Sequence, residues 1–144
     1  CRRLLVCACE DVGLAHPQII PIVKSCVDIA MQVGMPEARI PLADAVILVC
    51  NSPKSNSAYN AINSASIDIK NHPTCAVPRH LQNVHCDSTT QQTSQNYLYP
   101  HDYKNHWVKQ QYLPDCLKNS TYYNPSQNKN EQAYKHFWDN IKNL

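Results

Sequence analysis

The sequence of 144 residues has little glycine, no long hydrophobic run and almost no net charge. Glycine occurs only at Gly13 and Gly34, so the chain cannot form a glycine-rich phosphate loop, a dinucleotide-binding turn or a nucleophile elbow. No apolar run is longer than that of residues 45–50, whereas a membrane-spanning helix needs roughly 20 apolar residues. These absences exclude the common nucleotide-binding and hydrolase motifs. They also predict a soluble cytoplasmic protein without a membrane partner.

Basic and acidic residues are nearly balanced, with 13 lysines and arginines against 11 aspartates and glutamates. A dedicated nucleic-acid-binding module usually carries a denser basic face. We therefore expect only weak binding to single-stranded DNA, with a Kd of roughly 10⁻⁴ M or weaker at physiological salt. The residues that we expect to make any such contact are Arg2, Arg3, Lys104 and Lys109.

Eight cysteines could form a disulfide framework if the chain were a small secreted protein. The first five lie in apolar segments with helical spacing, where thiols pack as small hydrophobic side chains. We therefore predict that all of them are reduced thiols. They are Cys1, Cys7, Cys9, Cys26, Cys50, Cys75, Cys86 and Cys116.

Apolar side chains recur every three or four residues through most of residues 1–72, which predicts an all-α, compact helical core. The expected helices cover residues 3–9, 17–33 and 41–50, followed by a helix that Ser55 or Asn56 caps and that ends by residue 71. Within residues 41–50 only Asp44 is polar, so we expect the central buried helix there.

The composition changes at Pro73, and residues 73–127 carry most of the tyrosines and no helical period. We predict an irregular aromatic extension that packs against the helical core. Helical spacing returns in residues 128–144, which predicts a final amphipathic helix. We interpret residues 1–144 as a single domain. The side chains expected to hold the extension are Tyr97, Tyr99, Tyr103, Trp107, Tyr112, Leu113, Tyr122 and Tyr123.

Two short motifs near the N-terminus contain residue types that can carry chemistry. Glu10 and Asp11 are adjacent, but adjacent helical residues point about 100° apart, so the two carboxylates are poorly placed to flank one substrate. Cys7 and Cys9 form a C-x-C pair that does not share a helix face, which disfavours metal binding. We favour a structural role for both motifs.

Histidines and cysteines gather in residues 72–86, and both residue types bind zinc. Their spacing lacks the two close pairs that bracket a loop in a zinc finger. We therefore favour surface histidines and buried thiols over a metal site, and we predict no catalytic, metal or cofactor-binding residue in this chain. The group consists of His72, Cys75, His80, His85 and Cys86.

Aromatic residues alternate with lysines between residues 97 and 135. A surface that stacks single-stranded bases has this composition. An irregular segment also needs aromatic side chains for packing, however, and we favour that interpretation.

Seven strings of the sequence together carry a family resemblance. They are EDVGLAHPQ (10–18), GMPEARIPLADAVILVC (34–50), SPKSNSAYNAINSA (52–65), HPTCAVPRHLQN (72–83), YPHDY (99–103), QQYLPDCL (110–117) and YYNPS (122–126). In this order and spacing, residues 2–126 resemble the C-terminal domain of the replication-associated recombination ATPases. This family includes the bacterial RarA/MgsA proteins and the eukaryotic Werner-helicase-interacting protein.

The resemblance implies that an AAA+ ATPase module similar to clamp loaders precedes this chain, and that ATP and magnesium bind in that module. It also implies an all-α domain through which subunits form tetramers. The parent protein is expected to bind DNA and replication proteins. The chain departs from the family at His16, where an aspartate is usual, and in residues 84–96, which lack the usual lysines.

We therefore expect an oligomerisation and scaffolding domain, without enzymatic activity of its own, in a DNA-dependent ATPase of replication-fork maintenance, recombination and repair. The alternative is an auxiliary module that binds single-stranded DNA. The two consecutive apolar helices present more apolar surface than a small domain readily covers, which favours self-association. The expected interface residues are Ile20, Val27, Met31 and Ile47.

Overall fold

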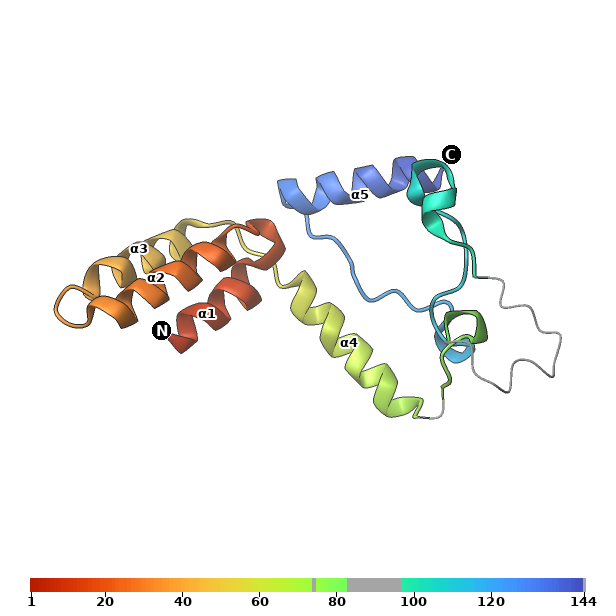
Figure 1. The fold of residues 1–144 in the computed structure, drawn as a ribbon, viewed down its shortest axis with the longest axis horizontal. Coiled ribbons are helices and arrows are strands. Elements are labelled where there is room, and N and C mark those ends of the chain that lie inside the picture. The colour runs from red at the N-terminus through yellow and green to blue at the C-terminus, as the bar shows by residue number, and fades with distance from the viewer. Residues whose placement is uncertain (74, 83–96, 144) are drawn as a thin grey trace. The chain divides into compact units, whose positions relative to one another are not determined.

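The computed structural model describes residues 1–73, 75–82 and 97–143, and Figure 1 shows its helices. Within these ranges the chain forms α-helices and short helical turns and no strand, so the all-α prediction is confirmed. None of the described helices is both long and apolar enough to cross a bilayer. The α-helices are α1 (Arg2–Cys7), α2 (Ile19–Val33), α3 (Arg39–Asn51), α4 (Ser57–Asn71) and α5 (Lys129–Lys142).

The chain divides into two compact units. The first unit contains Cys1–Asn63 and Tyr122–Asn143, and the second contains Ser64–Thr121. The final helix therefore belongs to the same unit as the N-terminal helices, although the extension separates them in sequence. The single-domain interpretation and its boundaries at residues 72 and 127 stay predictions.

The N-terminal helix of the first unit does not end abruptly at a glycine. α1 continues into a π-helical turn, Ala8–Val12, and then a 3-10 turn, Gly13–Ala15. Gly13 has φ +45°, and a Cβ atom there would lie 3.1 Å from the carbonyl oxygen of Ser55. Only glycine therefore fits this turn without strain, since L side chains rarely adopt this backbone conformation.

α1, α2 and α3 lie side by side in the first unit (Figure 1). The turn between α2 and α3 contains Gly34, with φ +70°, and a cis peptide bond before Pro36. α2 begins at Ile19, and its N-cap residue, Gln18, makes no side-chain capping hydrogen bond. The core cluster consists of Ala8, Val12, Ile19, Val23 and Ala45.

α3 is not the central buried helix that its composition predicts. Ala45 is its one buried residue, while Val46 and Ile47 are 44% and 61% exposed. An almost wholly apolar helix needs neighbours on most sides to be buried. α3 packs chiefly against α2, so much of its apolar surface remains uncovered.

The second unit has little hydrophobic core. Among its described residues Leu117 is the one buried hydrophobic side chain. The prediction that the extension's tyrosines pack inward is wrong for Tyr97, Tyr99, Tyr103 and Tyr112, which are 40–53% exposed. Short turns and polar side chains, rather than aromatic packing, organise this part of the chain. Residues 84–96, which depart from the family by lacking the usual lysines, lie outside the described residues.

We predict that Ile19→Ala lowers the free energy of unfolding by about 2–5 kcal/mol, because Ile19 is fully buried and the truncation leaves a cavity. Chemical denaturation measures this change. Ile67→Ala is the matched control, since Ile67 is 56% exposed on α4 and its truncation should change stability by less than about 0.5 kcal/mol. Equal effects of the two substitutions would contradict the assignment of the core.

Candidate functional site

A buried carboxylate organises the first unit. Glu131, in the first turn of α5, is 0% exposed. One carboxylate oxygen accepts hydrogen bonds from Ser57 Oγ and from Tyr123 Oη, the latter at 3.1 Å. The other accepts hydrogen bonds from Ser55 Oγ at 2.8 Å and from Asn128 Nδ2. We call this set of residues the Glu131 network.

The hydrogen-bond donors keep Glu131 ionised. Burial favours the neutral acid and raises the pKa of Glu131, but the hydrogen bonds from Ser57, Ser55 and their neighbours outweigh burial and lower the pKa below its usual value. Burial and the hydrogen bond to Glu131 raise the pKa of Tyr123 to about 12. The phenol therefore remains a proton donor to the carboxylate at neutral pH.

The Glu131 network joins segments that are far apart in sequence. Ser55 and Ser57 lie at the start of α4, and Ser55 N–H also donates to the Asp11 carbonyl oxygen at 2.8 Å. Asn130 Nδ2 donates to the Ala15 carbonyl oxygen at 2.8 Å, which ties α5 to the 3-10 turn Gly13–Ala15. The network and these neighbouring bonds therefore position α5, the start of α4 and the two turns that follow α1. Because its carboxylate is fully buried, we assign it a structural role.

Glu131 is not among the residues predicted from the sequence. A local signal exists, because Asn128 Oδ1 accepts a hydrogen bond from Glu131 N–H at 3.0 Å while the Glu131 side chain returns to Asn128. This reciprocal pair resembles a capping box, which an N-x-x-E pattern before a helix can indicate. The serine partners lie more than 70 residues away, so no local pattern connects them to Glu131.

The two motifs at the N-terminus lie on different clefts of the first unit. Asp11 and Cys7 line a cleft of about 510 Å³, whereas Glu10 and Cys9 line a separate apolar groove. A hydrogen bond to Asp11, together with burial, raises the pKa of the Cys7 thiol. Glu10 and Asp11 therefore do not flank a common site, and Cys7 stays protonated at neutral pH.

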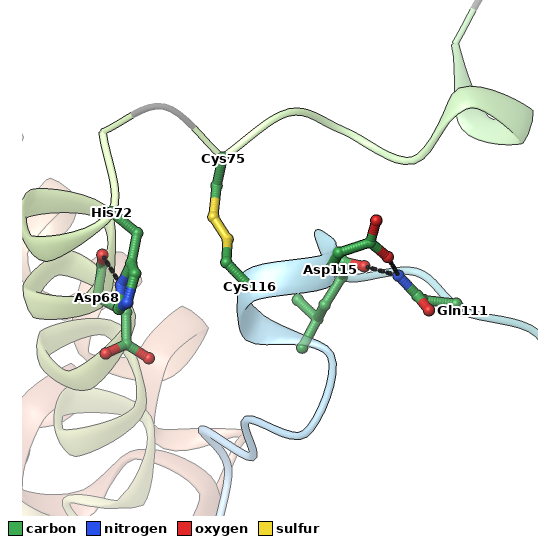
Figure 2. The surroundings of a disulfide bond; sticks show 7 residues. Asp68, His72, Cys75, Gln111, Asp115 and Cys116 are labelled. Carbon is green, nitrogen blue, oxygen red and sulfur yellow. Dashed lines mark hydrogen bonds between the residues drawn. A yellow bond between two sulfur atoms is a disulfide. The ribbon is translucent and has the colours of Figure 1, made fainter.

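Cys75 and Cys116 form a disulfide in the second unit, with their Cα atoms 6.4 Å apart (Figure 2). The prediction that all cysteines are reduced is therefore wrong for this pair. The pairing depends on a fold that brings together residues separated by 41 positions, which local spacing does not reveal. The free cysteines in the described residues are Cys1, Cys7, Cys9, Cys26 and Cys50.

The residues of the His and Cys group occupy different environments. His72 Nδ1 lies 3.1 Å from the Asp68 carbonyl oxygen, and His80 Nε2 lies 2.8 Å from that of Gln111. Cys75 is in the disulfide, so its sulfur is not a thiolate ligand. His85 and Cys86 lie outside the described residues. In the described ranges no three potential ligand side chains converge on one point.

The structure separates the predicted interface residues into two kinds. Ile20, Met31 and Ile47 are on the surface, with exposed fractions of 38%, 74% and 61%. Val27 is only 7% exposed and lies in the interior, so it is not available to a partner. Helical periodicity identifies an apolar residue but does not say which side of a broad apolar face packs inward.

The predicted DNA-contact residues are all exposed. Arg2 and Arg3 lie in the first turn of α1 in the first unit. Lys104 and Lys109 lie in the second unit, where Lys104 begins a 3-10 turn. Their contact with DNA stays a prediction.

Comparison with known proteins finds one family model and several relatives that match most of the chain. Residues 1–142 match the family described as MgsA AAA+ ATPase C terminal. Replication-associated recombination protein A of Bacillus subtilis is 51% identical over 142 residues, a match that covers 97% of the chain and 34% of that protein. Proteins of the same name in Haemophilus influenzae and Escherichia coli are 35% and 32% identical, each over 87% of the chain and 28% of the relative. The chain thus spans about a third of the length of these relatives.

We predict that Glu131→Gln lowers the free energy of unfolding by about 1–3 kcal/mol at neutral pH, because the amide nitrogen cannot accept the hydrogen bonds that the carboxylate accepts. The folded-state pKa of Glu131 is lowered, so its contribution is present above the unfolded-state pKa, about 4.3, and is lost as the pH falls through the folded-state pKa. Denaturation at several pH values should show a smaller acid-induced loss in the variant.

The exposed Glu37 provides the matched control for this experiment. Glu37→Gln should leave both the stability at neutral pH and its decline in acid nearly unchanged. A Glu131→Gln variant as stable as the Glu37→Gln variant would show that the network contributes nothing.

We predict that Cys75→Ser destabilises the second unit by about 2–4 kcal/mol, because the disulfide restricts a long loop of the unfolded chain. Limited proteolysis should then cut residues 73–121 faster than in the unaltered chain. Cys50→Ser, which removes an exposed free thiol, is the control and should leave the cleavage rate unchanged. Free Cys75 and Cys116 thiols in the untreated protein, detected by alkylation and mass spectrometry, would contradict the pairing.

Proposed function

The chain belongs to the family of MgsA AAA+ ATPase C-terminal domains, and on this premise we propose that it is an oligomerisation and scaffolding domain. Its parent would be a clamp-loader-like, DNA-dependent AAA+ ATPase of replication-fork maintenance, recombination and repair. The observation that carries this proposal is the large number of exposed apolar side chains on α2, α3 and the turn between them.

These exposed residues form what we call the α2–α3 surface. Isolated apolar side chains on a protein surface are ordinary, but a dense set on neighbouring elements is typical of a protein interface. Self-association would cover the set, and closed symmetric assemblies are the common outcome for soluble proteins. We propose a homotetramer. The α2–α3 surface consists of Ile20, Ile22, Ile29, Met31, Val33, Met35, Ile40, Val46 and Ile47.

The buried side of the same helices supports this role. Ile19, Val23 and Ala45 are fully buried in the core cluster, so one stripe of α2 and one of α3 are anchored, and the exposed apolar side chains of α2 flank its buried stripe. An interface on a packed scaffold loses less conformational freedom on association than one on a mobile segment. The fold therefore presents the α2–α3 surface in a form suited to binding a second copy.

ATP hydrolysis would belong to the remainder of the parent protein. The chain spans about a third of its relatives' length, and its two glycines cannot build a phosphate-binding loop. We propose that ATP and magnesium bind in a separate ATPase module, and that DNA and replication proteins are partners of the whole protein in the cytoplasm. The domain itself would supply the assembly and no catalytic residue.

We predict that the chain is an oligomer at about 50 µM, and that Met31→Glu or Ile47→Glu lowers its mass toward that of one chain. Burying an unpaired carboxylate in an apolar interface is strongly unfavourable. Light scattering coupled to size-exclusion chromatography measures the mass.

Phe137→Glu is the matched control, because Phe137 on α5 is 59% exposed and Ile47 is 61% exposed. This variant should keep the mass of the unaltered chain. A monomeric unaltered chain would overturn the proposed function. An oligomer that persists in both the Met31→Glu and Ile47→Glu variants would instead show that the interface does not lie on the α2–α3 surface.

A further inference from the structure

A glutamine side chain closes a loop in the second unit. Gln110 Nε2 donates a hydrogen bond to the Leu98 carbonyl oxygen at 2.7 Å, and Gln110 Oε1 accepts one from Leu98 N–H at 3.1 Å. The side-chain amide thereby pairs with both backbone groups of Leu98. We call residues 98–110 the clamped loop. Compact surface loops whose ends are held together are frequently functional.

The backbone inside the clamped loop is held in an uncommon conformation. It forms the 3-10 turns Pro100–Asp102 and Lys104–His106. Asn105 and His106 have φ values of +59° and +52°. Two consecutive residues other than glycine in the left-handed region are uncommon, and such strain is often found at functional sites. The turn is fixed in part by a 3.0 Å hydrogen bond from His106 N–H to the Tyr103 carbonyl oxygen.

The clamped loop displays aromatic rings on the surface. The ring centroids of Tyr99 and His101 are 5.1 Å apart, and those of His101 and His106 are 4.9 Å apart. All of these side chains are exposed, and Tyr99 is 53% exposed. The rings contact one another at the surface and are not part of a hydrophobic core. We call Tyr99, His101 and His106 the ring cluster; it is exposed to solvent.

The charge of the clamped loop is small. Lys104 and Lys109 are exposed, and Asp102 in the same loop offsets one of them. The loop can therefore neutralise few phosphates, so a nucleic acid would derive much of its affinity from base stacking. Stacking tolerates any base sequence and needs an unpaired base, which restricts the ligand to single strands.

We propose that the clamped loop is a binding site for single-stranded nucleic acid, in which a base stacks on the ring cluster and Lys104 contacts the adjacent phosphate. Gln110 acts as a positioning residue, because it holds the loop and need not touch the ligand. This site differs in its chemistry from the proposed self-association surface, because it uses exposed rings and a lysine rather than aliphatic side chains.

Fluorescence anisotropy with labelled oligonucleotides tests the proposal on the unaltered chain at low salt, where weak binding is measurable. An oligothymidylate and an abasic strand of equal length carry the same phosphates and differ in their bases. Stacking should make the oligothymidylate bind roughly five- to 150-fold more tightly than the abasic strand. An oligouridylate in parallel shows whether the site distinguishes DNA from RNA. Equal affinity for the thymidylate and abasic strands, or no detectable binding to either, would overturn the proposal.

Substitutions assign the binding to the ring cluster. Tyr99→Ala and His101→Ala should weaken oligothymidylate binding several-fold and leave abasic-strand binding unchanged. Tyr59→Ala is the matched control, because Tyr59 is 46% exposed on α4 and lies outside the clamped loop. Unfolding midpoints equal to that of the unaltered chain show that each variant is folded. A loss in Tyr59→Ala equal to that in Tyr99→Ala would overturn the assignment.

Two further variants separate phosphate contact from positioning. Lys104→Gln should remove about one phosphate contact, so the slope of log Kd against log salt concentration should fall by about one. The change should be the same for the oligothymidylate and the abasic strand. Gln110→Ala should weaken only the base-dependent part, because it releases the loop without removing a ring or a charge. An unchanged salt dependence in Lys104→Gln, or full base-dependent binding in Gln110→Ala, would contradict the roles assigned to these residues.

Discussion

The first unit depends on keeping one carboxylate ionised in a place that excludes water. A buried charge without a partner is very unfavourable, and no described cationic side chain hydrogen-bonds to Glu131. Hydroxyl and amide donors from the start of α4 and from the segment before α5 supply the compensation. Each donor must therefore be delivered to within hydrogen-bonding distance, which fixes the approach of α5 and the start of α4. The requirement makes the network specific to one arrangement, because a misplaced segment would leave Glu131 unpaired.

The arrangement around Glu131 leaves apolar side chains of α2 and α3 exposed. With Gly13 against Ser55 and Asn130 bonded to the Ala15 carbonyl, the polar contacts are concentrated around the end of α1. α2 and α3 extend from this region and pack against each other, with Ile19 and Val23 turned inward. Their remaining apolar side chains have no described neighbour able to bury them fully. A fold held by a polar centre can thus leave apolar side chains of α2 and α3 exposed.

The sequence predicted those features that depend on local periodicity. It located α2 and α5 to within a few residues, and it identified Ile20, Met31 and Ile47 as apolar residues in excess of the core. It placed Val27 on the same surface because periodicity gives the width of an apolar face but not its orientation. It missed the partners of Glu131 and the pairing of Cys75 with Cys116, since both join residues that only the tertiary fold brings together. The capping pair of Asn128 and Glu131 could have been predicted from the local N-x-x-E pattern.

The second unit is ordered by local restraints on the chain rather than by a hydrophobic core. With Leu117 as its one buried hydrophobic side chain among the described residues, hydrophobic burial contributes little there. The Cys75–Cys116 bond and the Gln110 clamp act instead by restricting the chain, one covalently and the other through paired backbone hydrogen bonds. Such restraints do not require side chains to turn inward. The rings of Tyr99, His101 and His106 can therefore stay on the surface in a fixed turn, which a segment stabilised by aromatic burial could not allow.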